Sequence, residues 1–319
     1  MHWKKTLLVL AIVAVIVTTL ISQQEIFIGM VGPNYERFVQ ESNAPHWTMQ
    51  TNSFHVQSTP AFLQVSDAQR IPRILHQTAP RADLDIQVYE TCMINRGMNP
   101  EYEYRFYTDR EMNEFIQTYF PQYKDLYDTV IPGAFRADLF RYMVLHVHGG
   151  VYLDCKSSTI LPLRDFLPPN ATFASFLDKI STTIQISFLA ATSKHPVIEA
   201  CITQAFDHIA RQEYGRFAFD ITGPMLCGRM FNRVLGHDEL DLIEIGAYGV
   251  EKDLVILGAL KHVGPSQNYE VLVDGSDQPL VSRACGKYYQ SRLLTDHWNS
   301  YGVRWFTGRV YKTPLTPPS

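Results

Sequence analysis

Residues 134–156 of the chain read AFRADLFRYMVLHVHGGVYLDCK, and this stretch decides the fold. Every fourth residue along 134–148 is apolar, as on one face of a helix: Phe135, Leu139, Met143 and Val147. The pair Gly149-Gly150 ends that helix. Residues 151–154, VYLD, then alternate between two faces, which predicts a strand that finishes on Asp154.

The same succession of strand and helix extends to both sides of this stretch. We predict strands over 71–78 and 102–107 and helices over 88–95, 112–119, 196–210 and 224–235. Strands that alternate with helices favour an α/β fold with a parallel-centred sheet covered on both faces.

Four charged residues of the central stretch are candidates for a functional site. Ligands of open α/β sheets collect beyond the carboxyl ends of the strands, which singles out Asp154. Asp138 and Arg141 lie about one turn apart and can point into the same crevice from the helix. Lys156 follows Asp154 two residues later. A surface ion pair between Asp138 and Arg141 is the alternative interpretation.

A second candidate is the start of the last predicted helix, Thr222-Gly223-Pro224. Thr222 can cap this helix and Pro224 suits its first turn, so free backbone N–H groups there could meet an anionic group. A plain helix start explains the same residues.

Residues 136–142 and 148–154 resemble the sugar-nucleotide-binding region, the DXD region, of a group of Golgi and microbial glycosyltransferases. That group includes yeast α-1,6-mannosyltransferases, sphingolipid mannosyltransferases and animal α-1,4-galactosyltransferases. The resemblance extends to 71–78, 99–104 and 222–224, with a weaker echo at 296–298 and Trp305. It implies a GT-A (Rossmann-like) nucleotide-sugar-binding fold and hexose transfer with retention of anomeric configuration.

The resemblance also assigns roles to single residues. Asp138 and Arg141 correspond to the family's helix acid and arginine, which hold hydroxyls of the donor, and Asp154 corresponds to the first aspartate of DXD. The expected donor-binding residues are His76, Gln77, Tyr152, Thr222 and Gly223. The implied donor is GDP-mannose or a UDP-hexose, and the implied acceptor is a glycan or glycolipid hydroxyl.

The chain departs from the family at Lys156, where the second aspartate of DXD usually binds Mn²⁺ under the diphosphate. Three interpretations stay open. Lys156 neutralises the leaving diphosphate directly, or Lys156 turns away while Asp154 holds Mn²⁺ with Asp296 or His297, or the site has lost its activity. In the first case we expect weak metal dependence. In the last case the chain is a non-catalytic binding protein of the same fold.

The N-terminus predicts a membrane anchor. Fifteen uncharged residues, 7–21, follow Lys4 and Lys5, which favours a single-pass type II protein in the Golgi or the endoplasmic reticulum. We expect a cytosolic tail (1–6), a signal-anchor helix (7–28), a stem (29–69), the catalytic domain (70–312) and a tail (313–319). A cleaved signal peptide is the alternative.

Composition excludes several other classes. The chain has 319 residues, of which 46% are hydrophobic, so it can bury a large core. Its net charge of −4 offers no basic field, so we expect no nucleic-acid partner. The fingerprints of dinucleotide-binding, P-loop, zincin and α/β-hydrolase proteins are absent from the sequence. The five cysteines have no zinc-ligand spacing, and disulfides among four of them are compatible with a lumenal protein, with Cys155 left unpaired.

Overall fold

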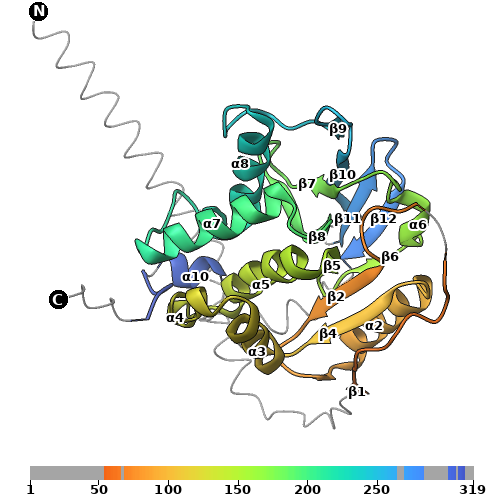
Figure 1. Cartoon of the computed structure of the whole chain (residues 1–319), viewed down its shortest axis with the longest axis horizontal. Helices are drawn as coiled ribbons and strands as arrows, with labels where there is room; N and C mark the ends of the chain where they lie inside the picture. Colours follow the sequence, from red (N-terminus) through yellow and green to blue (C-terminus); the bar gives the residue numbers. More distant parts are fainter. Residues whose placement is uncertain (1–53, 66–67, 264–268, 284–300, 307, 313–319) are drawn as a thin grey trace, which may run out of the picture. The chain divides into compact units, whose positions relative to one another are not determined.

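The computed structural model describes residues 54–65, 68–263, 269–283, 301–306 and 308–312. They belong to one compact unit, 52–319 (Figure 1). The expected anchor (7–28), Asp296, His297 and the tail (313–319) lie outside the described residues. Within the described residues, no helix is both long and apolar enough to cross a membrane.

The chain alternates between strands and helices. The strands are β1 (Phe54–His55), β2 (Ile74–Thr78), β3 (Asp83–Leu84), β4 (Glu103–Tyr107), β5 (Gly150–Leu153), β6 (Ser158–Thr159), β7 (Phe173–Leu177), β8 (Ile184–Ala191), β9 (Gly246–Tyr248), β10 (Leu254–Val263), β11 (Tyr269–Asp274) and β12 (Pro279–Arg283). The α-helices are α2 (Ile86–Met98), α3 (Asp109–Tyr119), α4 (Lys124–Thr129), α5 (Gly133–His148), α6 (Leu163–Phe166), α7 (Pro196–Ala210), α8 (Pro224–Leu235) and α10 (Tyr301–Phe306). Two 3₁₀ turns are η1 (Pro121–Tyr123) and η2 (Ala218–Asp220). The five predicted helices and three predicted strands are all confirmed, with small shifts at their ends.

One mixed sheet carries the fold, with the strand order β4-β2-β5-β8-β7-β10-β11-β12-β6 and β9 paired to β10. Strands β4, β2 and β5 are parallel, and so are β7 and β10. The prediction of a parallel-centred sheet is therefore only partly right. Strand β8 stands in the middle and runs antiparallel to both β5 and β7, because a short turn joins it to β7.

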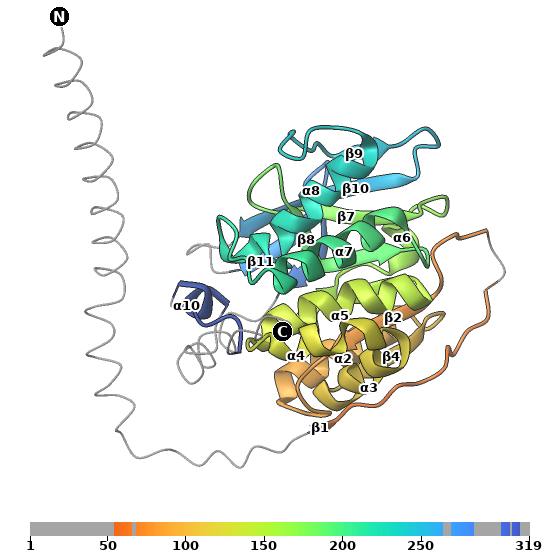
Figure 2. The ribbon, with the colours of Figure 1, turned by 60° about the vertical axis from the view of Figure 1, so that its left-hand side comes forward.

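Helices cover the sheet on both faces. Helices α3, α5, α7 and α8 pack on one face together with Tyr152 and Leu189 of the sheet (Figure 2). Helices α2 and α6 pack on the other face together with Val151 and Leu153. The alternation predicted for residues 151–153 is thus confirmed.

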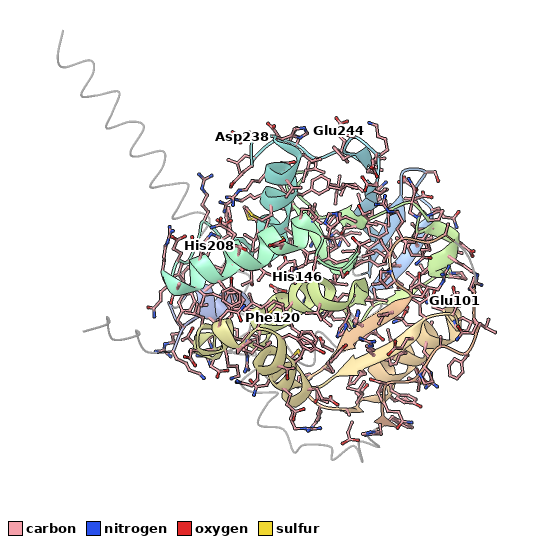
Figure 3. The ribbon with its side chains drawn as sticks, in the orientation of Figure 1. Glu101, Phe120, His146, His208, Asp238 and Glu244 are labelled. Carbon is pink, nitrogen blue, oxygen red and sulfur yellow. The ribbon has the colours of Figure 1, made fainter. Side chains whose placement is uncertain are left out.

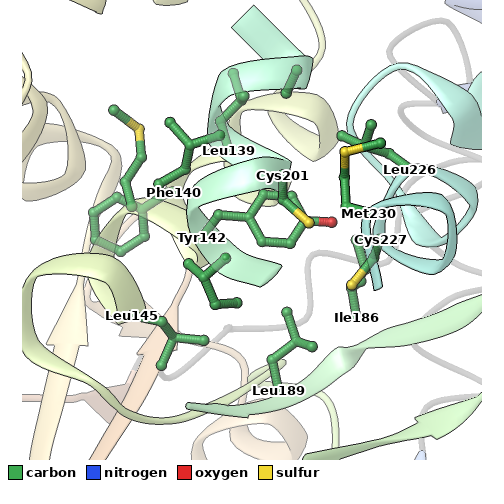
Figure 4. Close-up of a cluster of buried hydrophobic side chains, with 14 of the residues drawn as sticks. Leu139, Phe140, Tyr142, Leu145, Ile186, Leu189, Cys201, Leu226, Cys227 and Met230 are labelled. Carbon is green, nitrogen blue, oxygen red and sulfur yellow. The ribbon is translucent and has the colours of Figure 1, made fainter. Parts of the chain in front are cut away.

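Helix α5 is buried through its middle turns, from Asp138 to Leu145. Its side chains Leu139, Tyr142 and Leu145 pack between the sheet and helices α7 and α8 (Figure 4). Toward its end, the His146 ring lies 6.0 Å from the Phe120 ring, measured between centroids (Figure 3). A helix buried on most of its surface can carry a charged side chain only where that side chain is paired.

The turn from α5 into β5 needs its two glycines. Gly149 and Gly150 have φ values of +64° and +101°, which residues with a Cβ rarely adopt. A Cβ on Gly150 would also lie 2.5 Å from the Ile74 carbonyl oxygen of β2. These two residues let the helix pass directly into the strand.

Part of the expected stem is packed against the folded unit. Strand β1 pairs with β3, Val56 is buried in the core beneath α2, and Thr59 forms a bridge with Tyr104. The folded unit therefore includes residues before Arg70. The rest of the expected stem, 29–53, lies outside the described residues.

Candidate active site

The candidate site lies where three parallel strands end. Strands β4, β2 and β5 present their carboxyl ends at one edge of the sheet, and Asp154 follows β5 directly. The N-terminal half of α5 lies over the same edge, because α5 runs antiparallel to the strand that it precedes. Asp138 belongs to this half of α5, and Arg141 follows at the middle of the helix.

Four predicted residues form a continuous row of alternating charge. Arg141 Nη2 lies 3.0 Å from Asp138 Oδ1, and Arg141 Nη1 lies 3.4 Å from Asp154 Oδ1. Lys156 Nζ lies 3.9 Å from Asp154 Oδ2. Asp138 and Arg141 of α5 are buried. The Asp154 and Lys156 side chains are 16% and 22% exposed. The row thus leads from the core to solvent, and its outer end is accessible to a ligand.

Arg141 is held from several sides. Its guanidinium donates to the backbone carbonyls of Ile186 and Ala137, and it lies over the Tyr152 ring, 4.7 Å from the centroid. Burial alone would lower the pKa of Arg141, but neighbouring Tyr152, Asp154 and Asp138 raise it above its usual value. The charge of Arg141 is therefore fixed, and the surface-ion-pair interpretation does not describe this buried group.

The predicted loop 222–224 reaches the same cluster. Thr222 Oγ1 donates to Asp138 Oδ2 at 3.0 Å, and Tyr142 of α5 donates to the Gly223 carbonyl at 3.4 Å. Asp138 therefore accepts from Arg141 on one oxygen and from Thr222 on the other. This loop joins helix α8 to the row of charges.

Two further predicted residues, Tyr152 and Gln77, belong to the strands beneath the site. Tyr152 exchanges a hydrogen bond with Thr78 at 2.9 Å, and burial raises its pKa. Gln77 donates to the backbone carbonyls of Leu153 and Asp154, at 3.3 and 3.4 Å. Gln77 thus holds the end of β5 in place.

His76 lies apart from the row, at the other end of β5. Its Nε2 donates to the Gly149 carbonyl at 2.9 Å, which leaves Nδ1 of the neutral ring to accept from Tyr107 at 3.2 Å. Burial lowers its pKa to about 3. His76 has no exposed surface and both of its ring nitrogens are engaged, so it holds the α5–β5 turn. Its contact with a donor stays a prediction.

Ser187 of β8 belongs to the site but was not predicted. The Ser187 carbonyl accepts from the Asp154 backbone N–H at 2.9 Å, so the two residues lie side by side. Its hydroxyl is buried and has no hydrogen-bond partner among the described residues. A buried hydroxyl without a partner costs free energy, which marks it as a group that a ligand could satisfy. Serine in an apolar run such as 184–191 has no sequence signature that would have revealed this role.

The residues around Asp154 do not fit a divalent metal on their own. Its carboxylate oxygens face two cations, Arg141 and Lys156, where a metal site would supply further anionic or neutral ligands. Among the described residues, no group of three His, Cys, Asp or Glu side chains is placed to hold a metal ion. The tentative ligand His297 lies outside them.

The structure describes four of the five cysteines, and no disulfide joins any two of these four. Cys92, Cys201 and Cys227 are buried, and Cys155 is partly exposed. The disulfides that the composition allowed are absent among these four, while Cys285 lies outside the described residues. The prediction for Cys155 concerns its pairing with Cys285 as well and stays a prediction.

Acids and an arginine thus gather at the carboxyl ends of the strands, the position where open α/β sheets bind their ligands. Residues 82–174 match the family described as "Glycosyltransferase sugar-binding region containing DXD motif". The chain therefore carries a glycosyltransferase sugar-binding region, and this region contains Asp138, Arg141, Asp154 and Lys156.

Several curated proteins are similar to parts of the chain. Inositol phosphoceramide mannosyltransferase 3 of Schizosaccharomyces pombe is 37% identical over 87 residues, which cover 26% of this chain and 24% of that protein. Mannosyl phosphorylinositol ceramide synthase SUR1 of Saccharomyces cerevisiae is 30% identical over 129 residues, or 40% and 33% of the two chains. An uncharacterized glycosyltransferase of Acanthamoeba polyphaga mimivirus is 30% identical over 144 residues, or 43% and 56%. The chain thus spans a quarter to about half of the relatives it matches.

Proposed function

We propose that this chain is a retaining hexosyltransferase that transfers mannose from GDP-mannose to the polar headgroup of a sphingolipid-type acceptor. The observation that carries the proposal is the row Asp138, Arg141, Asp154 and Lys156 inside a glycosyltransferase sugar-binding region. The names of the yeast relatives, a mannosyltransferase and a mannosyl phosphorylinositol ceramide synthase, support mannose and the lipid. A UDP-hexose donor and a glycan acceptor are the alternatives that a donor and acceptor screen would detect.

In this reaction the bond between the anomeric carbon and the diphosphate oxygen breaks, and a bond to the acceptor oxygen forms on the same face. Negative charge grows on the departing diphosphate, and the acceptor hydroxyl loses its proton to a departing phosphate oxygen. The protein must therefore place positive charge where the diphosphate leaves and must hold the sugar in a fixed orientation.

The row of charges divides these two tasks. Asp138 is fixed by Arg141 and Thr222, and we assign to it and Arg141 the binding of donor hydroxyls, with Asp154 at the outer end. The unsatisfied Ser187 hydroxyl beside Asp154 is a further donor contact. Tyr152 and Gln77 position these groups from the strands, through their contacts with Arg141 and the Asp154 backbone, while His76 holds the turn at the other end of β5.

We assign to Lys156 the neutralisation of the diphosphate. It is partly exposed at the outer end of the row, where a ligand can reach its ammonium group. At ~4 Å and an effective dielectric constant of about 20, each pair of unit charges is worth about 4 kcal/mol, enough to replace a metal's role in part. Neither a divalent ion nor its ligands are needed for this step, so we propose weak metal dependence.

The test combines chelation with two substitutions of Lys156. Wild-type protein treated with EDTA should retain transfer, and Lys156→Ala should lower kcat about 10²-fold to 10³-fold. Lys156→Asp restores the second aspartate of DXD and should be inactive in EDTA but partly reactivated by Mn²⁺. Lys252→Asn, which removes an exposed lysine from a turn before β10 with φ of +58°, is the matched control and should behave like the wild type. If EDTA abolishes wild-type transfer and Mn²⁺ restores it, the proposal that Lys156 neutralises the diphosphate without a metal is wrong.

Donor binding without transfer would instead support the non-catalytic alternative. A thermal shift screen of GDP-mannose, UDP-galactose and UDP-glucose identifies the donor, because a bound ligand raises stability by RT ln(1 + [L]/Kd). Transfer to water alone would indicate a hydrolase.

A further inference from the structure

Two segments far apart in the sequence present aromatic side chains to solvent. Phe217 precedes η2 and is 55% exposed, and Phe219 lies within η2 and is 52% exposed. Phe306 is the last residue of α10 and is 70% exposed. Phenylalanine is among the residues that proteins most often bury, so three in one neighbourhood are unusual. We call the three the aromatic patch.

The two segments are packed together. Helix α10 contacts η2, Trp305 donates to the Tyr214 carbonyl at 2.5 Å, and Tyr311 donates to the Glu213 carbonyl at 2.6 Å. The Tyr214 and Tyr311 rings meet edge to face at 5.5 Å. The aromatic patch therefore stands on a fixed base of buried and half-buried aromatic rings.

The aromatic patch is close to the reacting groups along the chain. Ile221 and Thr222 follow η2 directly, and Thr222 donates to Asp138. Only Asp220 and Ile221 thus stand between Phe219 and the residue that holds Asp138. A partner seated on the aromatic patch would lie at the edge of the candidate site.

The charge of these segments is positive where it is exposed. Arg216 and Arg309 are exposed and form no ion pair with any residue that the structure describes. The two acids of segment 213–220 are already paired: Asp220 is buried against Arg229 at 2.7 Å, and Glu213 lies 3.6 Å from Arg211. Segment 304–312 contains no acid at all. Unpaired arginines remain free to meet an anionic surface.

We propose that the aromatic patch, with Arg216 and Arg309, is a docking surface for an anionic lipid bilayer. Exposed aromatic rings insert at the boundary between headgroups and acyl chains, while arginines bind anionic headgroups. Such a surface holds the candidate site against the membrane that contains a lipid acceptor. This inference rests on the proposed lipid acceptor for its purpose, but its test does not depend on transfer.

The decisive experiment measures the environment of Phe219 in the full-length protein. Phe219→Cys is labelled with an environment-sensitive nitrobenzoxadiazole dye and reconstituted into vesicles of phosphatidylcholine with about 30% phosphatidylserine. The labelled wild type gives the background of the native cysteines. Val250→Cys, at a fully exposed apolar residue in the turn before β10, is the matched control.

The expected result is a blue shift and an intensity gain of at least about two-fold for the Phe219 label, larger in anionic than in neutral vesicles. The Arg216→Glu/Arg309→Glu variant should lose the preference for anionic vesicles. A Phe219 label that emits like the Val250 label, or emits equally in detergent and in vesicles, overturns the proposal.

A second readout links the surface to turnover. Phe217→Ser/Phe219→Ser should lower transfer to a bilayer-embedded lipid acceptor about five-fold or more and leave transfer to the same acceptor in detergent micelles unchanged. Equal loss in both preparations overturns the docking role. If the wild type transfers to no acceptor at all, the proposed function fails while the dye measurement still decides the docking surface.

Discussion

The Arg141 guanidinium lies 3.4 Å from the Asp154 carboxylate, so one side chain of α5 binds the residue that ends β5. Because the same guanidinium also binds Asp138, two buried or half-buried acids depend on one cation. Removal of that cation would leave Asp154 with Lys156 and Asp138 with the Thr222 hydroxyl, and would take from both acids the charge they share.

Arg141→Ala should therefore lower the free energy of unfolding by about 3–5 kcal/mol, the cost of breaking a buried ion pair from one side. Urea unfolding of the full-length protein in detergent measures this loss. Arg141→Lys keeps the charge but cannot reach both acids and the backbone carbonyls, so it should lose transfer more than stability. Equal stability of Arg141→Ala and the wild type would contradict the burial of this network.

Thr222→Val tests the second contact of Asp138. The substitution removes the 3.0 Å hydrogen bond and conserves volume closely, so we expect a loss of about 1 kcal/mol in the free energy of unfolding. In a double-mutant cycle with Asp138→Asn, the two losses should not add, because the residues share one interaction. Additive losses would show that Thr222 and Asp138 act separately.

Ser187→Ala separates donor binding from stability. Its hydroxyl has no partner among the described residues, so its removal should leave stability unchanged or slightly raised. If the donor satisfies this hydroxyl, affinity should fall by about 1 kcal/mol, or about five-fold in Kd. Calorimetric titration of the donor into both proteins measures the difference, and an unchanged Kd would remove Ser187 from the donor site.

Gly150→Ala and Gly97→Ala form a matched pair of glycine substitutions. Gly150 has φ of +101° and a Cβ there would meet the Ile74 carbonyl, so the first substitution should cost about 1–3 kcal/mol. Gly97 lies in α2, and a Cβ added there would meet no atom within 4 Å, so the second should gain about 0.5–1 kcal/mol. Thermal unfolding of both variants tests the pair, and a neutral Gly150→Ala would contradict the strained turn.

His76 should make stability fall in acid. Its pKa is about 3 in the folded chain against about 6.5 when unfolded, so below pH 6.5 the unfolded state binds a proton that the folded state does not. Stability is therefore unaffected above pH 6.5 and falls between pH 6.5 and 3, by up to about 1.4 kcal/mol per pH unit. His76→Gln can still donate to the Gly149 carbonyl. It should lower by about one the number of protons that the unfolded state binds in excess of the folded state, so that stability falls less steeply in acid. His237→Gln, at an exposed histidine, is the control, and an unchanged slope in His76→Gln would contradict the buried neutral ring.

The sequence was sufficient to predict the α5–β5 unit and the residues that gather at its edge. Spacing along one helix and one strand places Asp138, Arg141 and Asp154, because these positions are close in the chain. The contribution of β8 to the site could not be predicted in this way. Arg141 and Asp154 contact backbone carbonyls of β8, and a backbone carbonyl has no sequence signature. The position of β8 in the middle of the sheet also depends on long-range pairing.

His76 shows what similarity to a family leaves open. Its place in a strand that resembles the family's first strand suggested a ligand contact, but the same residue is fully buried and binds the Gly149 carbonyl. Sequence similarity does not distinguish a residue that touches a ligand from one that holds the turn behind it.

The direct passage of α5 into β5 through Gly149 and Gly150 has a consequence for how the protein folds. Arg141 and Asp154 meet across a short loop, so their pairing costs little chain entropy, whereas β8 and residues 222–224 must be brought in from further along the chain. We therefore expect the charged helix–strand unit to assemble early, as a nucleus onto which β8 and residues 222–224 later condense.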